Sequence, residues 1–386
     1  MTDHTTFPFY LATWYRKSPY WEATRRAGCT SWDLYNHMLI PTIYDDDVKE
    51  YWHIVEKVAL WDVAVERQVE ITGPDAAKFT QLLTCRDLSK CAVGQCKYAP
   101  IIAPDGGIVN DPILLRLGDN HFWLSLADSD TLLYAKGVQA FAGLEVMVRE
   151  PDVSPLQVQG PKSVDVMRAL FGDESDVLGL PYYHCCEALA EGIPVIVSRT
   201  GWTGEIGYEL YLRDGRRGTE LWDAVMAAGA PFDIRATAPS DQRRMEAGIF
   251  NYGNDMTVEN NPFEITGLER LVECLDSDVD HIGKDALSEI RHAGVRQKLV
   301  GVGIGGAPLA LWLEDFWPVY RNQELVGRLT SACHSPRLDL NMGYAWVPIE
   351  LAAEGTELEI SSPEGTLEAT VSPLPFFDPA KDIPKG

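Results

Sequence analysis

The 386-residue chain lacks an excess of positive charge: 33 lysines and arginines stand against 57 aspartates and glutamates, a formal net charge of −24. Such a surface repels phosphate backbones and anionic lipids, so we expect neither nucleic acid nor a membrane as a partner. The sequence also has no apolar run of about 18 residues, which excludes a transmembrane helix. Because no basic segment followed by an apolar core opens the chain, we expect a cytoplasmic protein.

Closely spaced cysteine pairs are missing as well. None of the eight cysteines belongs to a Cys-x-x-Cys pair, and Cys91 and Cys96 have no histidine at ligand spacing. A zinc site needs thiolates or imidazoles that converge on one point, so we predict no metal. His184 beside Cys185 and Cys186 does not indicate a catalytic thiol, since neighbouring side chains on a strand point to opposite faces. We expect reduced, structural thiols.

Hydrophobic residues make up 46% of the chain and charged residues 23%, the balance of a folded globular protein. At about 150 residues per domain, the length predicts two or three domains. Apolar periodicity and turn residues predict helices over 47–60, 73–83, 221–228 and 241–250, and strands over 67–72, 121–126, 194–198 and 207–212. A Pro-Asp-Gly-Gly turn joins two strand-like runs, 95–103 and 108–118, into a hairpin. Residues 1–45 are rich in aromatic side chains and read as irregular.

The pattern changes near residues 290–298, which we take as a domain boundary. Beyond it, short strands follow one another about every ten residues, near 298–302, 327–331, 343–346 and 357–360. This spacing predicts a separate antiparallel barrel or sandwich at the C-terminal end.

Two glycine-rich turns lead to candidate site residues. After Asp105-Gly106-Gly107, an apolar strand carries Asp111, and a carboxylate on such a strand is costly unless it has a partner or a task. A turn-capping role is the alternative. In Gly-Trp-Thr-Gly-Glu-Ile-Gly-Tyr-Glu, Glu209 can accept two N–H bonds from an amino-pyrimidine edge such as that of a pterin, and Trp202 can stack on the ring. A hairpin with exposed glutamates is the alternative here.

Two further segments combine charge or aromatic side chains in unusual ways. Arg244 and Gly248 share one face of the predicted helix over 241–250, which is also typical of a solvated charged face. The segment Trp-Asp-Leu-Tyr-Asn-His-Met-Leu-Ile-Pro at 32–41 can line a pocket for a methylated onium group through cation–π attraction. Alternatively, it is an N-terminal arm whose aromatic side chains pack on the core.

Taken in order, these segments resemble a known family. Gly-Gly-Ile-Val-Asn-Asp, Val-Gln-Gly-Pro, Gly-Trp-Thr-Gly-Glu, Arg-Met-Glu-Ala-Gly and Ile-Gly-Lys-Asp-Ala-Leu follow one another as in the tetrahydrofolate-dependent aminomethyltransferases, the family of the glycine cleavage T-protein. Leu-Tyr-Asn-His-Met-Leu-Ile-Pro and Trp-Asp-Val-Ala-Val-Glu-Arg-Gln-Val-Glu-Ile look like its dimethylsulfoniopropionate demethylase branch. The resemblance covers about residues 45–375.

The resemblance implies an α+β fold with three lobes, a T-protein-like cloverleaf of mixed and antiparallel sheets with helices. Tetrahydrofolate is expected near its centre, and a β-barrel domain at the C-terminal end. The implied division is a folate-binding lobe over 1–150, whose chain need not be continuous, a second folate-binding lobe over 151–295, and the barrel over 296–386. We expect a monomer or a homodimer.

Carried over by position, the resemblance makes Asp111 the catalytic carboxylate beside the reactive folate nitrogens. It assigns cofactor binding to four residues: Tyr98, Trp202, Glu209 and Arg244. A second family arginine is replaced by Ser240, which leaves open how the distal part of folate is held.

The implied reaction moves a methyl group from a small methylated donor, foremost the sulfonium dimethylsulfoniopropionate, to N5 of tetrahydrofolate, with no metal. Because N5 becomes cationic as it is alkylated, a carboxylate at Asp111 stabilises the charge and then removes the proton. Trp32, Tyr35 and Trp61 are candidate contacts for the onium group. Three alternatives stay open: an aminomethyltransferase of the T-protein type, a folate-dependent demethylase of O-methyl or N-methyl substrates, and a non-catalytic folate-binding regulator.

Overall fold

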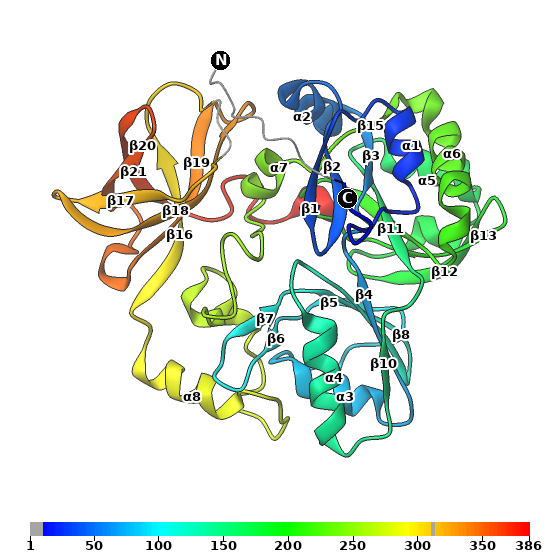
Figure 1. The fold of residues 1–386 in the computed structure, drawn as a ribbon, viewed down its shortest axis with the longest axis horizontal. Coiled ribbons are helices and arrows are strands. Elements are labelled where there is room, and N and C mark those ends of the chain that lie inside the picture. The colour runs from blue at the N-terminus through cyan, green and yellow to red at the C-terminus, as the bar shows by residue number, and fades with distance from the viewer. Residues whose placement is uncertain (1–10, 310–312) are drawn as a thin grey trace.

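The computed structural model describes residues 11–309 and 313–386, which form three lobes around the centre of the molecule (Figure 1). Two lobes contain a β-sheet covered by helices, and the third is a closed barrel. The predicted α+β class with a C-terminal barrel is therefore confirmed.

The largest sheet collects strands that lie far apart in the chain. Its six strands lie in the order β12 (Cys185–Ala190), β13 (Ile193–Ser198), β14 (Gly207–Leu212), β11 (Ser154–Gln159), β3 (Val58–Asp62) and β15 (Ile234–Ala236). Within this sheet β3 and β15 are parallel, and the other neighbours are antiparallel. The helices that pack on this lobe are α1 (Trp21–Arg26), α2 (Asp47–Glu56), α5 (Ser163–Phe171) and α6 (Gly218–Gly229).

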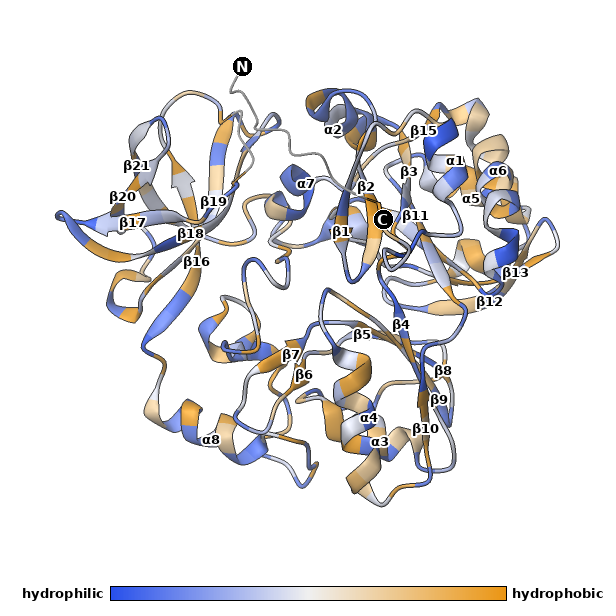
Figure 2. Ribbon diagram, in the orientation of Figure 1, coloured by the Kyte–Doolittle hydropathy of each residue, from blue (hydrophilic) through white to orange (hydrophobic). Residues whose placement is uncertain are grey.

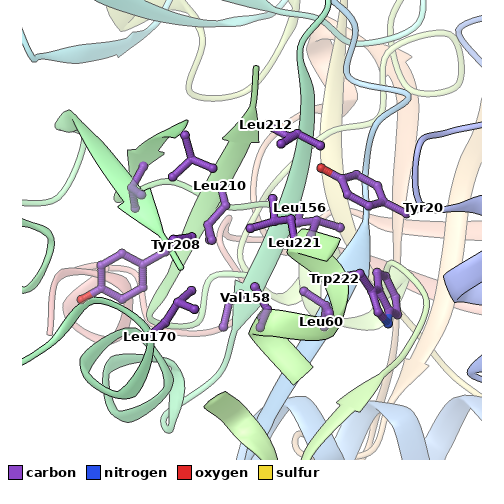
Figure 3. Close-up of a cluster of buried hydrophobic side chains, with 14 of the residues drawn as sticks. Tyr20, Leu60, Leu156, Val158, Leu170, Tyr208, Leu210, Leu212, Leu221 and Trp222 are labelled. Atoms are coloured by element: carbon purple, nitrogen blue, oxygen red, sulfur yellow. The ribbon is translucent and has the colours of Figure 1, made fainter. Parts of the chain in front are cut away.

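Buried apolar side chains between the sheet and α5 and α6 form the core of this lobe (Figure 3). Leu60 of β3 lies with Leu156 and Val158 of β11, although about a hundred residues separate them in the sequence. The lobes are thus interleaved in sequence, because β3 belongs to the same sheet as residues 154–236. The division of the chain into three consecutive segments stays a prediction.

The predicted helix over 47–60 is too long. The helix α2 ends at Glu56, and the next apolar run, Val58–Asp62, is the strand β3. All five residues of this strand are buried, because hydrophobic clusters pack on both faces of the sheet: Leu60 lies in the core under α5 and α6, and Trp61 packs with Ile54 of α2. A short run that is buried on both faces has no period-two signal, so periodicity alone does not distinguish it from a buried helix.

The second sheet has five strands in the order β10 (Met147–Arg149), β4 (Gln68–Thr72), β9 (His121–Ser125), β8 (Ile113–Gly118) and β5 (Cys96–Tyr98). Helices α3 (Ala76–Leu83) and α4 (Thr131–Ala142) belong to this lobe, whose hydrophobic residues Figure 2 shows along both helices. The predicted hairpin is confirmed, since β6 (Ile101–Ile102) pairs with β7 (Ile108–Asn110) and β5 pairs with β8.

The barrel closes through six strands: β16 (Gln297–Ile304), β19 (Leu340–Pro348), β18 (Glu324–Ser335), β17 (Trp317–Arg321), β20 (Glu357–Ser362) and β21 (Gly365–Ser372). Helix α8 (Lys284–Ala293) precedes it. The chain then returns to the lobe of the six-stranded sheet and ends in the short helix α9 (Asp382–Lys385). There the Arg199 guanidinium donates to the carbonyls of Pro384 and Lys385 at 3.0 and 3.1 Å.

The N-terminal segment is more regular than its sequence suggests. Besides α1 it contains a hairpin of β1 (Ser31–Tyr35) and β2 (Met38–Ile43). Its turn residues Asn36 and His37 have φ values of 50° and 63°, as a type I′ turn requires. Histidine is not a usual residue there, so the turn signal is absent from the sequence. The first ten residues of this segment lie outside the described part of the chain.

The predicted helix over 241–250 is also too long. Helix α7 spans only Asp241–Glu246, because Gly248 has a φ of 68° and turns the chain out of the helix. Arg244 and Gly248 therefore do not share a helix face.

All eight cysteines are free. In the described ranges, no helix is both long and apolar enough to cross a membrane. No cluster of three histidine, cysteine or acidic side chains in these ranges is arranged to hold a metal ion.

Candidate active site

Asp111 lies between β7 and β8, and only one of its two carboxylate oxygens has a hydrogen-bond partner among the described residues. Its Oδ2 accepts a hydrogen bond from the Tyr98 hydroxyl at 2.8 Å. Its Oδ1 is buried and has no hydrogen-bond partner within the described ranges. The turn itself is capped by Asp105, which accepts the N–H of Gly107 at 3.1 Å, so Asp111 is free of that role.

Burial raises the pKa of Asp111 to about 7. The hydrogen bond from Tyr98 opposes this rise, and the charge of Asp255 adds to it. A carboxyl group with this pKa exchanges its proton near neutral pH, as a general base must.

Tyr35 reaches the same region from the tip of the β1–β2 hairpin. The next residue, Asn36, donates its side-chain amide to the Val65 carbonyl at 3.0 Å and its backbone N–H to the Asp128 carboxylate at 3.0 Å. Burial raises the pKa of Tyr35, and so do the charges of three nearby carboxylates, Asp111, Asp128 and Glu66. The hairpin therefore seats the Tyr35 ring among acidic side chains.

Glu209 is held by a dense set of donors on the six-stranded sheet. It lies opposite Gln157 of β11 and Ser198 of β13. Its carboxylate accepts hydrogen bonds from Gln157 Nε2 at 2.6 Å, the Tyr211 hydroxyl at 2.7 Å, Ser198 Oγ at 3.3 Å and the Thr200 hydroxyl. Only 2% of Glu209 is exposed, so these contacts fix its orientation. The alternative of a hairpin with exposed glutamates is wrong at this position.

Glu66, in the turn between β3 and β4, is a site candidate that sequence reasoning missed. Its two carboxylate oxygens accept from Gln157 Nε2 and Ser125 Oγ, each at 3.2 Å. Burial and the charge of Glu209 raise the pKa of Glu66 well above its ordinary value. The available signal was an acid within the apolar run Val-Ala-Val-Glu-Arg-Gln-Val-Glu-Ile, the same signal that singled out Asp111.

Several carboxylates near Asp111 and Tyr35 lack a paired cation among the residues that the structure describes. Within the described part of the chain, no lysine or arginine forms an ion pair with any of four carboxylates: Glu66, Asp111, Asp128 and Glu209. Buried carboxylates without cations are unfavourable unless a ligand compensates them. The site is thus suited to a partner that brings N–H donors or positive charge.

Arg244 and Trp202 lie against each other at the junction of α7 and the barrel, and their predicted folate contacts stay predictions. The Arg244 guanidinium pairs with Asp241 and, at 2.9 Å, with Asp255, and it donates to Ser331 Oγ of the barrel at 2.9 Å. It also lies over the Trp202 ring, 5.4 Å from the centroid. With 2% of its side chain exposed, Arg244 ties α7 to the barrel, and the alternative of a solvated charged face is wrong.

The three predicted onium contacts are not brought together. Trp61 is fully buried, donates its indole N–H to Thr237 Oγ1 at 2.7 Å and packs in the cluster that Trp202 adjoins. Trp32 packs against Trp21 with ring centroids 4.9 Å apart. Since Trp32 and Tyr35 are three residues apart on β1, they point to opposite faces of the hairpin. Tyr35 lies within electrostatic reach of Asp111.

Three lobes around a buried carboxylate, one of them a terminal six-stranded barrel, are the architecture of the T-protein type. The solved structure of glycine cleavage system aminomethyltransferase T from Bartonella henselae superposes with a TM-score of 0.83, covering 94% of this chain and 98% of that one. At 23% identity this likeness shows the fold alone.

Sequence comparison extends the likeness. Residues 6–275 match the GCVT N-terminal domain, and residues 297–378 match the glycine cleavage T-protein C-terminal barrel domain. Dimethylsulfoniopropionate demethylase DmdA of Ruegeria pomeroyi is 38% identical over 92% of this chain and 96% of its own. An aminomethyltransferase of Symbiobacterium thermophilum is 31% identical over 88% and 91%.

The chain belongs to the glycine cleavage T-protein family, as the order of its motifs predicts. Its relatives are tetrahydrofolate-dependent enzymes, and the predicted transferase class and use of tetrahydrofolate are confirmed at this level. The site fits that group, because its unpaired atoms are acceptors. Asp111 Oδ1 and Gln157 Oε1 are buried without partners, and the amino-pyrimidine edge of a pterin presents N–H donors.

Proposed function

We propose that this protein removes a methyl group from the sulfonium dimethylsulfoniopropionate and transfers it to N5 of tetrahydrofolate. The observation that carries the proposal is the buried Oδ1 of Asp111, which has no hydrogen-bond partner among the described residues. In the same ranges Glu66, Asp128 and Glu209 form no ion pair with a lysine or arginine. The 38% identity with a dimethylsulfoniopropionate demethylase supports the choice of donor.

When bound, tetrahydrofolate supplies the nucleophilic N5 that accepts the methyl group. The sulfonium–methyl bond breaks, a neutral sulfide leaves with the electron pair of that bond, and the N5 proton is released. Asp111 stabilises the positive charge that develops at N5 and takes up this proton. Tyr98 orients the carboxylate and, through its hydrogen bond, keeps part of it ionised near neutral pH.

Other residues of the chain position the reactants. Glu209, fixed by its four donors, grips the amino-pyrimidine edge, and Trp202 borders the same ring. Tyr35 offers its ring face to the onium group. The interior excludes water, which strengthens each of these electrostatic contacts.

A T-protein activity is the second candidate, because aminomethyltransferases align with most of the chain at about 30% identity. The two reactions give different products from different donors. A demethylase forms 5-methyltetrahydrofolate from a small donor, whereas a T-protein releases ammonia from an aminomethylated carrier protein.

The test incubates the purified protein with tetrahydrofolate and one donor at a time: dimethylsulfoniopropionate, an O-methyl aromatic acid, an N-methylated amine, or aminomethylated carrier protein. Mass spectrometry follows 5-methyltetrahydrofolate, and a separate assay follows ammonia. We expect methyl transfer from the sulfonium. Product from the carrier protein alone would establish the T-protein instead, and tight folate binding without product from any donor would indicate a regulator.

A further inference from the structure

Glu66 is a half-buried carboxylate for which the proposed mechanism has no use. Its two hydrogen bonds, from Ser125 Oγ and Gln157 Nε2, are both 3.2 Å long, at the weak end for such contacts. Glu209, by contrast, receives four donors, two of them within 2.7 Å. No ion pair to Glu66 exists among the residues that the structure describes. The charge of Glu66 is therefore poorly compensated by the protein alone.

The amide groups around Glu66 show the same imbalance. Gln157 is fully buried and Gln68 is 1% exposed, yet the side-chain oxygen of each has no hydrogen-bond partner. Their nitrogens are satisfied: Gln157 Nε2 bridges Glu66 and Glu209, and Gln68 Nε2 donates to Ser125 Oγ at 3.0 Å. Among the described residues, the two buried amide oxygens beside Glu66 are thus acceptors without donors. A ligand that carries positive charge, or polarised hydrogens, would satisfy them.

The hairpin tip places an aromatic ring against this carboxylate. Asn36 binds the carbonyl of Val65, the residue before Glu66, at 3.0 Å, and Tyr35 precedes Asn36. The contact between the hairpin tip and Val65 therefore brings Tyr35 close to Glu66, whose charge acts on the Tyr35 hydroxyl. An aromatic face and a carboxylate at one point are the two groups that together bind an organic cation.

We propose that Glu66, together with the ring of Tyr35, is the counter-charge that selects a cationic methyl donor. This role rests on the proposed function and adds to it the residue that selects cationic over uncharged methyl donors. Glu209 holds the pterin and Asp111 serves N5, so Glu66 remains for the onium group. Onium donors should then be accepted, and uncharged ethers and sulfides of the same size should be rejected.

The test uses Glu66→Gln, which keeps the size of the side chain and removes its charge. Its amide oxygen can still accept from Gln157 Nε2, and its new NH2 group can donate to Ser125 Oγ. The probes are dimethylsulfoniopropionate and trimethylsulfonium, which carries the positive charge without a carboxylate. We expect the KM for both to rise at least about tenfold, while the Kd for tetrahydrofolate stays within about twofold of the wild-type value. Calorimetry of trimethylsulfonium with the folate-free protein should show the same loss of affinity.

Three further variants control the result. Glu66→Asp retains the charge and should recover most of the affinity for trimethylsulfonium. Glu354→Gln makes the same charge change on an exposed turn of the barrel and should alter nothing. If Glu66→Gln does not fold, Tyr35→Leu serves in its place, because loss of the ring should also weaken onium binding at unchanged folate affinity.

The outcomes separate this role from the proposed function. Equal KM values for wild-type protein and Glu66→Gln would overturn the role of Glu66 and leave the demethylase proposal standing. A loss of folate affinity in place of onium affinity would also overturn it, since Glu66 would then belong to the pterin contacts. If the wild-type protein binds tetrahydrofolate but transfers no methyl group to it from any onium donor, both proposals are overturned.

Discussion

Replacing Asp111 by asparagine removes one charge and keeps the shape of the side chain. Tyr98 can still donate to the oxygen of the new amide, so the local geometry should survive. The substitution should have two opposite effects: it should slow methyl transfer strongly and make the folate-free protein more stable. Both effects follow from the burial of a carboxylate that has one unpartnered oxygen.

The pKa of the Asp111 carboxyl rises from 3.8 to about 7 because the group is buried. At about 1.4 kcal/mol per tenfold change in acidity, ionising Asp111 costs the folded, ligand-free protein up to ~4 kcal/mol. The folded state binds the proton more tightly than the unfolded chain between about pH 4 and pH 7, so this contribution to stability falls as pH rises through that range and stays low above it. The asparagine variant has no such dependence.

Urea unfolding of both proteins at about pH 5 and about pH 8 checks this reasoning. The variant should gain stability relative to the wild-type protein on going to the higher pH, with a change of roughly 2–3 kcal/mol between the two pH values. Turnover of the variant should fall on the order of 10²-fold or more, while folate affinity is largely retained. A stability difference that is the same at both pH values would refute the raised pKa, and near-normal turnover would remove Asp111 from the mechanism.

Three other substitutions probe the neighbouring groups. Tyr98→Phe deletes the hydrogen bond that lowers the pKa of Asp111, so the pH–rate profile should shift to higher pH; an unchanged profile would contradict the coupling. Glu209→Gln removes the charge that grips the pterin, and calorimetry should show folate affinity at least about tenfold weaker, a loss of about 1.4 kcal/mol. Arg244→Ala leaves Asp255 buried without its cation, and denaturant unfolding should show a stability loss of about 3–5 kcal/mol, whereas a merely exposed pair would cost below about 1 kcal/mol.

Local signals were enough for the elements that carry strong turn residues or regular alternation. Strand β14 has the predicted bounds, and the Pro-Asp-Gly-Gly turn joins β6 to β7 as expected. The barrel was predictable because its short strands recur at even spacing. Asp111 could be singled out because it is an acid on an otherwise apolar strand.

Other elements depend on contacts that a sequence does not display. The strand β3 reads as the end of a helix, and its pairing depends on β11 and β15, which follow about a hundred residues or more later. The β1–β2 hairpin depends on a left-handed His37, which the surrounding structure holds in place. Trp32 and Trp61 are of the residue type that forms aromatic cages for onium groups. The ring of Trp32 nevertheless packs on Trp21, and that of Trp61 packs in a hydrophobic cluster.

Partners, more than residue types, decide which charged side chains serve the reaction. A guanidinium such as that of Arg244 can bind an anion. Here its N–H groups are occupied by Asp241, Asp255 and Ser331, so its interactions stabilise the junction between α7 and the barrel. Asp111 accepts a hydrogen bond from one hydroxyl, and its other carboxylate oxygen has no partner among the described residues. This lowers the stability of the ligand-free protein, and a bound cationic centre would restore it. Most buried charged side chains of this protein are fully paired, so a carboxylate paired through one oxygen only marks a place left for a reactant. That difference is visible only once the lobes are assembled.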